Sequence, residues 1–131
     1  IKHDISVPVA AIPDFLARAT PAVLAIAPGA RSVGFGHLGD GNLHFNFNSP
    51  ADGDDTAFLA KWDAVQQCVH DIVKDFGGSI SAEHGIGAMK VAALPRYKSH
   101  AELDAMRAIK AALDPKNILN PGKTVPPVLK L

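Results

Sequence analysis

The stretch that decides the fold is residues 31–48, which read RSVGFGHLGDGNLHFNFN. Two β-prone runs, Arg31–Leu38 and Leu43–Asn48, flank Gly39–Asn42, whose residue types tolerate the positive φ angles of a turn. The second run alternates apolar and polar side chains, so a strand there has one face for a core and one polar face. The stretch therefore predicts a β-hairpin.

The residues before the hairpin predict a strand and a helix. Asp4–Val9 is a short β-prone run interrupted by Pro8, and Ile12–Ile26 has the composition of a helix. Pro21 lies inside that helix after Thr20, which predicts a kink or a restart of the helix there.

The residues after the hairpin predict two more helices. Apolar residues recur at steps of three and four from Phe58 to Phe76, as in an amphipathic helix of about five turns that Asp54 or Asp55 caps. Ser79–Ala82 is a candidate strand. The spacing of Ser99 and Glu102 is that of a capping box, followed by a helix that ends at Asp114-Pro115 and by a proline-rich tail, residues 114–127, expected to be extended.

The predicted order is β-α-β-β-α-β with an added C-terminal helix and tail. That order is typical of the α+β, ferredoxin-like split βαβ fold, in which helices cover one face of an antiparallel sheet. We expect a single domain over residues 1–131. The other sheet face carries His44 and Asn46 and calls for a partner or a ligand.

Composition excludes several classes of protein. The 131 residues are 47% apolar and 20% charged, which is typical of a globular protein. Thirteen basic residues balance thirteen acidic ones, so charge gives no case for binding nucleic acid or an anionic membrane. The single cysteine, Cys68, excludes an internal disulfide and a zinc site built on several cysteines. No apolar run approaches the ~20 residues that span a bilayer.

The first candidate site is the pair of histidines in the hairpin. If Gly39–Asn42 is a four-residue loop, His37 lies opposite His44 on one face, with Cβ atoms ~4.5–5.5 Å apart. Two imidazoles at that separation can bind one divalent metal. The alternative is a solvated hairpin with incidental histidines, because two ligands do not complete a site.

The second candidate site is Glu83-His84, followed by Gly85 and Gly87, which let the backbone turn sharply. In the predicted topology its strand lies in the same sheet as the hairpin. Glu83 could then complete a His₂Glu metal site, and His84 would be left as a general base. The alternative is a solvated strand end.

One motif misleads. Residues 34–39, GFGHLG, match the G-x-G-x-x-G pattern of dinucleotide-binding proteins. That pattern needs a helix to follow the glycines, whereas here a turn and a second strand are predicted. We therefore reject this interpretation.

Three segments together resemble one family. GHLGDGNLHFN, SAEHGIGAMK and LDPKNILNPGK are similar to the signatures of the C-terminal domain of FAD-linked oxidases. This is the branch of the vanillyl-alcohol-oxidase-type flavoproteins that holds D-lactate dehydrogenase, the glycolate oxidase flavin subunit and D-2-hydroxyglutarate dehydrogenase. The match covers nearly the whole chain, in order, and does not specify a substrate.

The resemblance implies roles for individual residues. His37, His44 and Glu83 would bind a divalent metal, usually zinc, and His84 would be the base that removes the substrate's hydroxyl proton. Lys2 and Asn46 would bind the substrate. Asn120 would make a contact toward the flavin.

The resemblance also implies cofactors and partners. FAD would be bound mainly by an N-terminal domain of the same parent chain, and this chain alone would be inactive. The substrate would be a D-2-hydroxy acid such as D-lactate. We expect a cytoplasmic location with membrane contact only through an electron acceptor, and an exposed sheet face could drive homodimer formation. Two alternatives stay open: a stand-alone ferredoxin-like module that binds a metal or a small acid, and a His₂Glu metal-dependent hydrolase.

Overall fold

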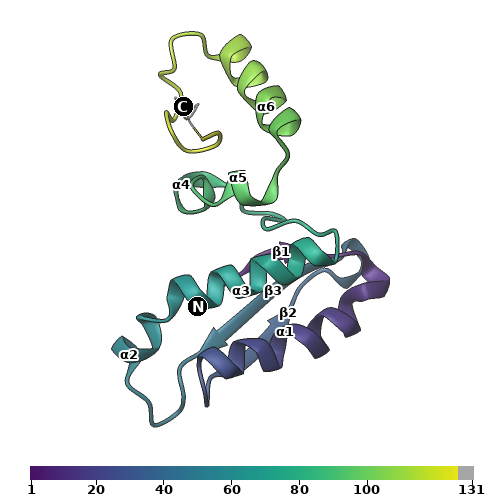
Figure 1. Ribbon diagram of the computed structural model, residues 1–131, viewed down its shortest axis with the longest axis vertical. Coiled ribbons are helices and arrows are strands. Elements are labelled where there is room, and N and C mark those ends of the chain that lie inside the picture. The colour runs from purple at the N-terminus through teal and green to yellow at the C-terminus, as the bar shows by residue number, and fades with distance from the viewer. Residues whose placement is uncertain (127–131) are drawn as a thin grey trace. The chain divides into compact units, whose positions relative to one another are not determined.

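The computed structural model describes residues 1–126 of the chain. It divides into two compact units, of which the first is Ile1–Glu83 and the second begins at His84. The first unit contains the sheet, and the elements of the second are helices and turns (Figure 1). The candidate site residues of the hairpin therefore belong to the first unit.

Three strands form the sheet: β1 (Asp4–Ser6), β2 (Arg31–Phe35) and β3 (Asn42–Asn48). Their order is β1-β3-β2, and both pairings are antiparallel. β1 and β2 consequently run parallel with β3 inserted between them, which is the split βαβ arrangement. The predicted α+β class and the hairpin of β2 and β3 are confirmed.

One face of β3 is the core of the first unit. Its alternate residues Leu43, Phe45 and Phe47 are at most 2% exposed. Helices α1 (Ile12–Ile26) and α3 (Trp62–Asp75) pack together over this face (Figure 1). The ring of Phe15 in α1 meets that of Phe45 edge-on, with centroids 5.3 Å apart. The predicted division of β3 into a core face and a polar face is thus confirmed.

One helix has the predicted bounds, and another prediction was wrong in detail. α1 continues through Pro21, so the helix does not restart there. Pro21 is exposed, so water can bond the carbonyl that loses its helical partner. The predicted five-turn helix is two helices, α2 (Asp55–Leu59) and α3, because Lys61 N–H bonds to the Phe58 carbonyl in a tight turn. Asp54 caps α2 as predicted.

By length and composition alone, the helical stretch Val9–Ile26 could cross a membrane. The core helix of a soluble protein passes the same test. Of this stretch 22% is buried, and its residues Phe15, Ala19 and Val23 are fully buried in the first unit.

The predicted strand Ser79–Ala82 is reduced to a single antiparallel bridge between Ser6 and Ser79. The two residues exchange both backbone hydrogen bonds, at 3.0 and 2.9 Å. Beyond Ser79, the Ser81 amide bonds to the Ser79 hydroxyl, and the amides of Ala82 and Glu83 bond to the side chain of Asp4 in β1. The strand prediction was therefore correct in place and wrong in length.

The second unit holds α4 (Gly87–Lys90), α5 (Leu94–Tyr97) and α6 (His100–Leu113). The capping box of Ser99 and Glu102 is confirmed at the start of α6. The tail after α6 is not extended but forms turns, because the Asp114 carboxylate accepts the amides of Ile118 and Leu119. Pro127, the last residue of the predicted tail, lies outside the described residues.

The capping box predicts a pH dependence for α6. The backbone N–H of Ser99, then Lys98 and the Ser99 hydroxyl, lower the pKa of Glu102 from 4.5 to about 2. Because the ionised Glu102 carboxylate is favoured in the folded helix, it stabilises the helix fully above about pH 4.5. This stabilisation is lost as the pH falls toward 2. We expect Glu102→Gln to weaken the dependence of α6 helicity on pH in this window, measured by NMR chemical shifts. Asp104→Asn, at an exposed site of the same helix, is the control and should titrate like the wild type.

Candidate functional site

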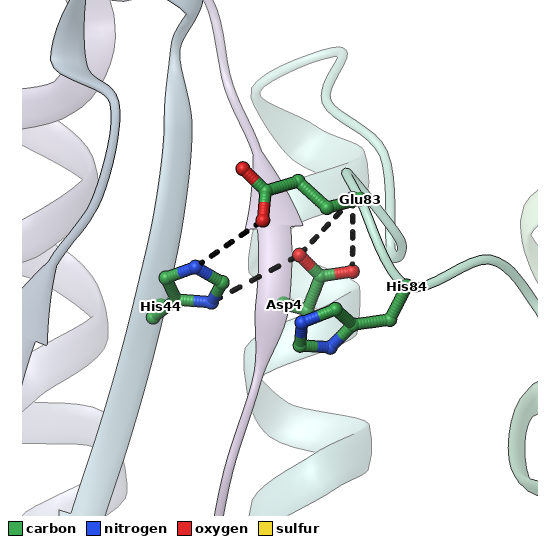
Figure 2. Close-up of side chains that lie close together, drawn as sticks. All are labelled: Asp4, His44, Glu83 and His84. Atoms are coloured by element: carbon green, nitrogen blue, oxygen red, sulfur yellow. Dashed lines mark hydrogen bonds and ion pairs between the residues drawn. The ribbon is translucent and has the colours of Figure 1, made fainter.

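The carboxylate of Glu83 is the centre of a polar cluster in the first unit. Nδ1 of His37 lies 2.8 Å from its Oε1, and Nε2 of His44 lies 3.6 Å from its Oε2. The side-chain amide of Asn42 also donates to Oε1. Figure 2 shows His44, Glu83 and Asp4 converging from β3, the segment after Ser79 and β1. The three residues of the predicted His₂Glu set are therefore neighbours in the structure.

His37 reaches Glu83 by a route that the sequence did not predict. The partner of His44 in the β2–β3 ladder is Phe35, so the predicted pairing of His37 with His44 was wrong. β2 ends at Phe35, and His37 precedes a 3₁₀ turn, Leu38–Asp40. The His37 carbonyl accepts hydrogen bonds from the amides of Asp40 and Asn42. The ring of Phe35 lies against His44, with centroids 4.9 Å apart, in the place predicted for His37. His37 meets the cluster from the turn instead.

Gly36 permits this departure from the strand. Its φ is +153°, and a Cβ on it would lie 2.3 Å from the Asn42 carbonyl oxygen. A side chain at this position would therefore separate the end of β2 from the start of β3. The close approach of the two backbones places His37 and Asn42 on the same side of Glu83.

Sequence reasoning missed Asp4. Its side chain is 4% exposed and accepts hydrogen bonds from the Ser81 hydroxyl at 3.2 Å and from the amides of Ala82 and Glu83 at 3.1 Å. It is the register partner of His44, whose Nδ1 lies 4.0 Å from its Oδ1. The only sequence signal is position, since Asp4 alternates with the apolar Ile5 on a short strand.

The donors present fit a divalent metal. One ligand-type atom from each of Asp4, His44 and Glu83 lies within 4.8 Å of the others, and His37 is not part of this group, although it contacts Glu83. Tetrahedral ligands at ~2.0–2.1 Å from zinc are roughly 3.3 Å apart. The imidazoles of His37 and His44 lie 2.8 and 3.6 Å from different oxygens of Glu83. Oδ1 of Asn42 is buried beside the cluster and accepts no hydrogen bond from the described residues. Neutral imidazole and carboxylate donors of this kind suit zinc.

A small cavity of about 270 Å³ opens beside Glu83. The described residues that line it include two carboxylates and no basic side chain; they are Ser6, Asp40, Asn42, Ser81, Ala82 and Glu83. An anionic ligand in this cavity would be repelled unless a cation supplied positive charge. The cavity and the metal-type donors are therefore complementary features of one site.

Of the remaining predicted residues, Lys2 and Asn46 belong to the first unit, and His84 and Asn120 belong to the second. Lys2 is exposed and precedes β1. On either side of it, the amides of Phe45 and Phe47 donate hydrogen bonds to the carbonyls of His3 and Ile1, which extends the pairing with β3. Asn46 lies on β3, where its Oδ1 accepts the His3 amide at 3.1 Å. The exposed His84 follows Glu83 directly and begins the second unit, in which Asn120 is also exposed.

Comparison with known proteins identifies the family. The model of the FAD-linked oxidases, C-terminal domain, matches residues 1–124. The chain belongs to this family. It is 44% identical over 122 residues to the D-2-hydroxyglutarate dehydrogenase of Stutzerimonas stutzeri, covering 93% of this chain and 26% of that protein.

Two further relatives agree. The mitochondrial D-2-hydroxyglutarate dehydrogenase of Danio rerio is 42% identical over 125 residues, covering 95% of this chain and 22% of that protein. Glycolate oxidase subunit GlcD of Bacillus subtilis is 44% identical over 92 residues, covering 68% of this chain and 18% of that protein. The chain thus spans about a quarter or less of the length of the relatives it matches, and the branch named by the sequence resemblance is confirmed.

The geometry at Gly36 gives a test of how this FAD-oxidase domain positions His37. Gly36→Ala should lower the free energy of unfolding by at least about 1 kcal/mol, because it combines a positive φ with a backbone clash. Gly39→Ala is the matched control in the same turn, where a Cβ would meet nothing within 4 Å. Urea unfolding of both variants measures the difference, and equal stabilities would contradict the described turn.

Proposed function

We propose that this chain is the substrate- and metal-binding part of a FAD-dependent dehydrogenase that oxidises a D-2-hydroxy acid to the 2-oxo acid. The observation that carries the proposal is the convergence of His37 and His44 on Glu83 within the family's C-terminal domain. Several relatives are named D-2-hydroxyglutarate dehydrogenase, which makes D-2-hydroxyglutarate the first substrate to test, ahead of D-lactate and glycolate.

In this proposal His37, His44 and Glu83 hold a divalent metal, zinc by resemblance to the family. When bound, the metal supplies a Lewis acid that lowers the pKa of the substrate's hydroxyl, and FAD supplies the acceptor for the hydride. A nitrogen that binds the metal must carry no proton, and a neutral imidazole has one such nitrogen.

Other residues of the chain bind the substrate and move its proton. A ring nitrogen of His84 takes the hydroxyl proton. Because Oδ1 of Asn46 already accepts the His3 amide, its Nδ2 is the group that donates to the substrate carboxylate. The Lys2 ammonium adds positive charge to the same carboxylate, and Asn120 contributes on the flavin side.

Zinc titration of the chain tests the metal site. Isothermal titration should show about one equivalent, and His37→Ala and Glu83→Ala should each weaken binding by well over tenfold, because each removes a ligand of the same ion. His100→Ala, which removes an exposed histidine in the second unit, is the control and should bind like the wild type. Retention of full affinity in His37→Ala or Glu83→Ala would contradict the ligand set.

Activity is tested with the chain joined to the FAD-binding part of its own parent protein. Anaerobic bleaching of the flavin by D-2-hydroxyglutarate, D-lactate or glycolate is the readout, and the L-enantiomers are controls for the first two acids. His84→Gln should slow bleaching while leaving zinc affinity within a few-fold of the wild type. Failure of all three acids to bleach the flavin would contradict the proposed reaction, as would hydrolytic activity without FAD.

A further inference from the structure

The side chain of Asp4 bonds to the segment that carries Glu83 and also lies beside His44. We propose that Asp4 is a positioning residue that sets the orientation of both Glu83 and His44 for metal binding. This inference rests on the proposed function, because the metal is the group toward which both side chains are oriented.

The first contact fixes the backbone of Glu83. Regular pairing with β1 stops at the bridge between Ser6 and Ser79, so the following amides have no strand partner. Both oxygens of Asp4 accept the Glu83 amide at 3.1 Å, and Oδ2 also accepts the Ala82 amide. A buried carboxylate that receives backbone N–H groups makes strong, charge-assisted hydrogen bonds. At Glu83, the proposed metal ligand, hydrogen bonds to Asp4 thereby take the place of the ladder bonds of a regular strand.

The second contact acts on the tautomer of His44. Nδ1 of this ring lies 4.0 Å from Oδ1 of Asp4, while Nε2 on the other side lies 3.6 Å from Glu83. A metal bound at Nε2 would leave the ring hydrogen on Nδ1, the nitrogen that faces the Asp4 carboxylate. Metal-ligating histidines in proteins commonly have such a carboxylate behind them.

Asp4 is better suited to positioning than to ligation. Its Oδ2 accepts from the Ser81 hydroxyl, the Ala82 amide and the Glu83 amide. These bonds occupy Oδ2, while Oδ1 shares the Glu83 amide and lies 4.0 Å from Nδ1 of His44. Glu83, with a side chain 41% exposed, and His37, at 68%, are by contrast open to an incoming ion.

Two measurements on the 131-residue chain test the orientation directly. Without metal, the amides of Ala82 and Glu83 should exchange slowly with solvent, and Asp4→Asn should speed their exchange at least tenfold. With zinc bound, nitrogen chemical shifts of the His44 ring should report a hydrogen on Nδ1 in the wild type. Unchanged exchange in Asp4→Asn, or a hydrogen on Nε2, would overturn the proposal.

Asp114→Asn is the matched control. Asp114 is also a buried carboxylate, 6% exposed, that accepts two backbone amides, but it belongs to the second unit. Its substitution should leave exchange at Ala82 and Glu83 unchanged. If Asp114→Asn accelerated these amides equally, the effect of Asp4 would be a general loss of stability and the proposal would fail.

Metal affinity provides the functional readout. Asp4→Asn should raise the dissociation constant for zinc by about 10–100-fold, as loss of an outer carboxylate does, while Asp114→Asn stays within about threefold. At saturating cobalt, Asp4→Asn should keep the wild-type visible spectrum, because the ligands are unchanged. A spectrum of altered intensity would make Asp4 a ligand and overturn the positioning role.

These outcomes separate the inference from the proposed function. If the wild-type chain bound no metal, the proposed metal site would fail. The exchange rates would still decide whether Asp4 holds the segment that carries Glu83. Conversely, normal zinc binding in Asp4→Asn would leave the proposed function intact and remove only the role of Asp4.

Discussion

The alternation of side chains along β3 is the constraint on which the rest of the first unit depends. β3 is the central strand of the sheet and is paired on both sides. Phe45 and Phe47 are fully buried on one of its faces. Because successive residues point to opposite faces, burial of these rings directs His44 and Asn46 to the other face. A slip of one residue would expose the rings and bury the histidine, so the packing of the core also orients the site.

Glu83 reaches this face without the support of a regular strand. The ladder beside β1 ends at Ser79, four residues before Glu83. A segment without ladder bonds is held only as firmly as its side-chain contacts allow. The Asp4 carboxylate and the Asn42 amide make those contacts at the backbone and at the side chain of Glu83, respectively. The site therefore joins a rigid donor, His44, to a donor whose position depends on hydrogen bonds.

Local signals in the sequence predicted much of this fold. The bounds of α1, the capping box of α6 and the buried face of β3 follow from periodicity and from caps, which involve residues only a few positions apart. What the sequence did not predict depends on distant residues. The end of β2 at Phe35 follows from the approach of Gly36 to Asn42. The predicted strand at Ser79–Ala82 is short because the Asp4 carboxylate accepts the amides of Ala82 and Glu83.

The candidate site shows the same division. His37, His44 and Glu83 were predicted to be neighbours, and they are, although His37 arrives from a turn and not from the strand. The motifs predicted which side chains are donors. The register of β3 and the turn after β2 determine where the side chains of His44 and His37 lie. Asp4 carries no motif of its own that points to the cluster. Its role depends on a pairing with His44 across 40 residues, which composition and spacing do not reveal.

Charge gives a final reason to connect the cluster with an acidic substrate. The cavity beside Glu83 is lined by the carboxylates of Asp40 and Glu83, and such a surface alone repels a 2-hydroxy acid. A divalent cation held by two neutral imidazoles and Glu83 would offset the charges of Glu83 and Asp40, so these groups would no longer carry a net negative charge. If the histidine–glutamate cluster holds a divalent cation, as proposed, the acid-lined cavity can accept an acid.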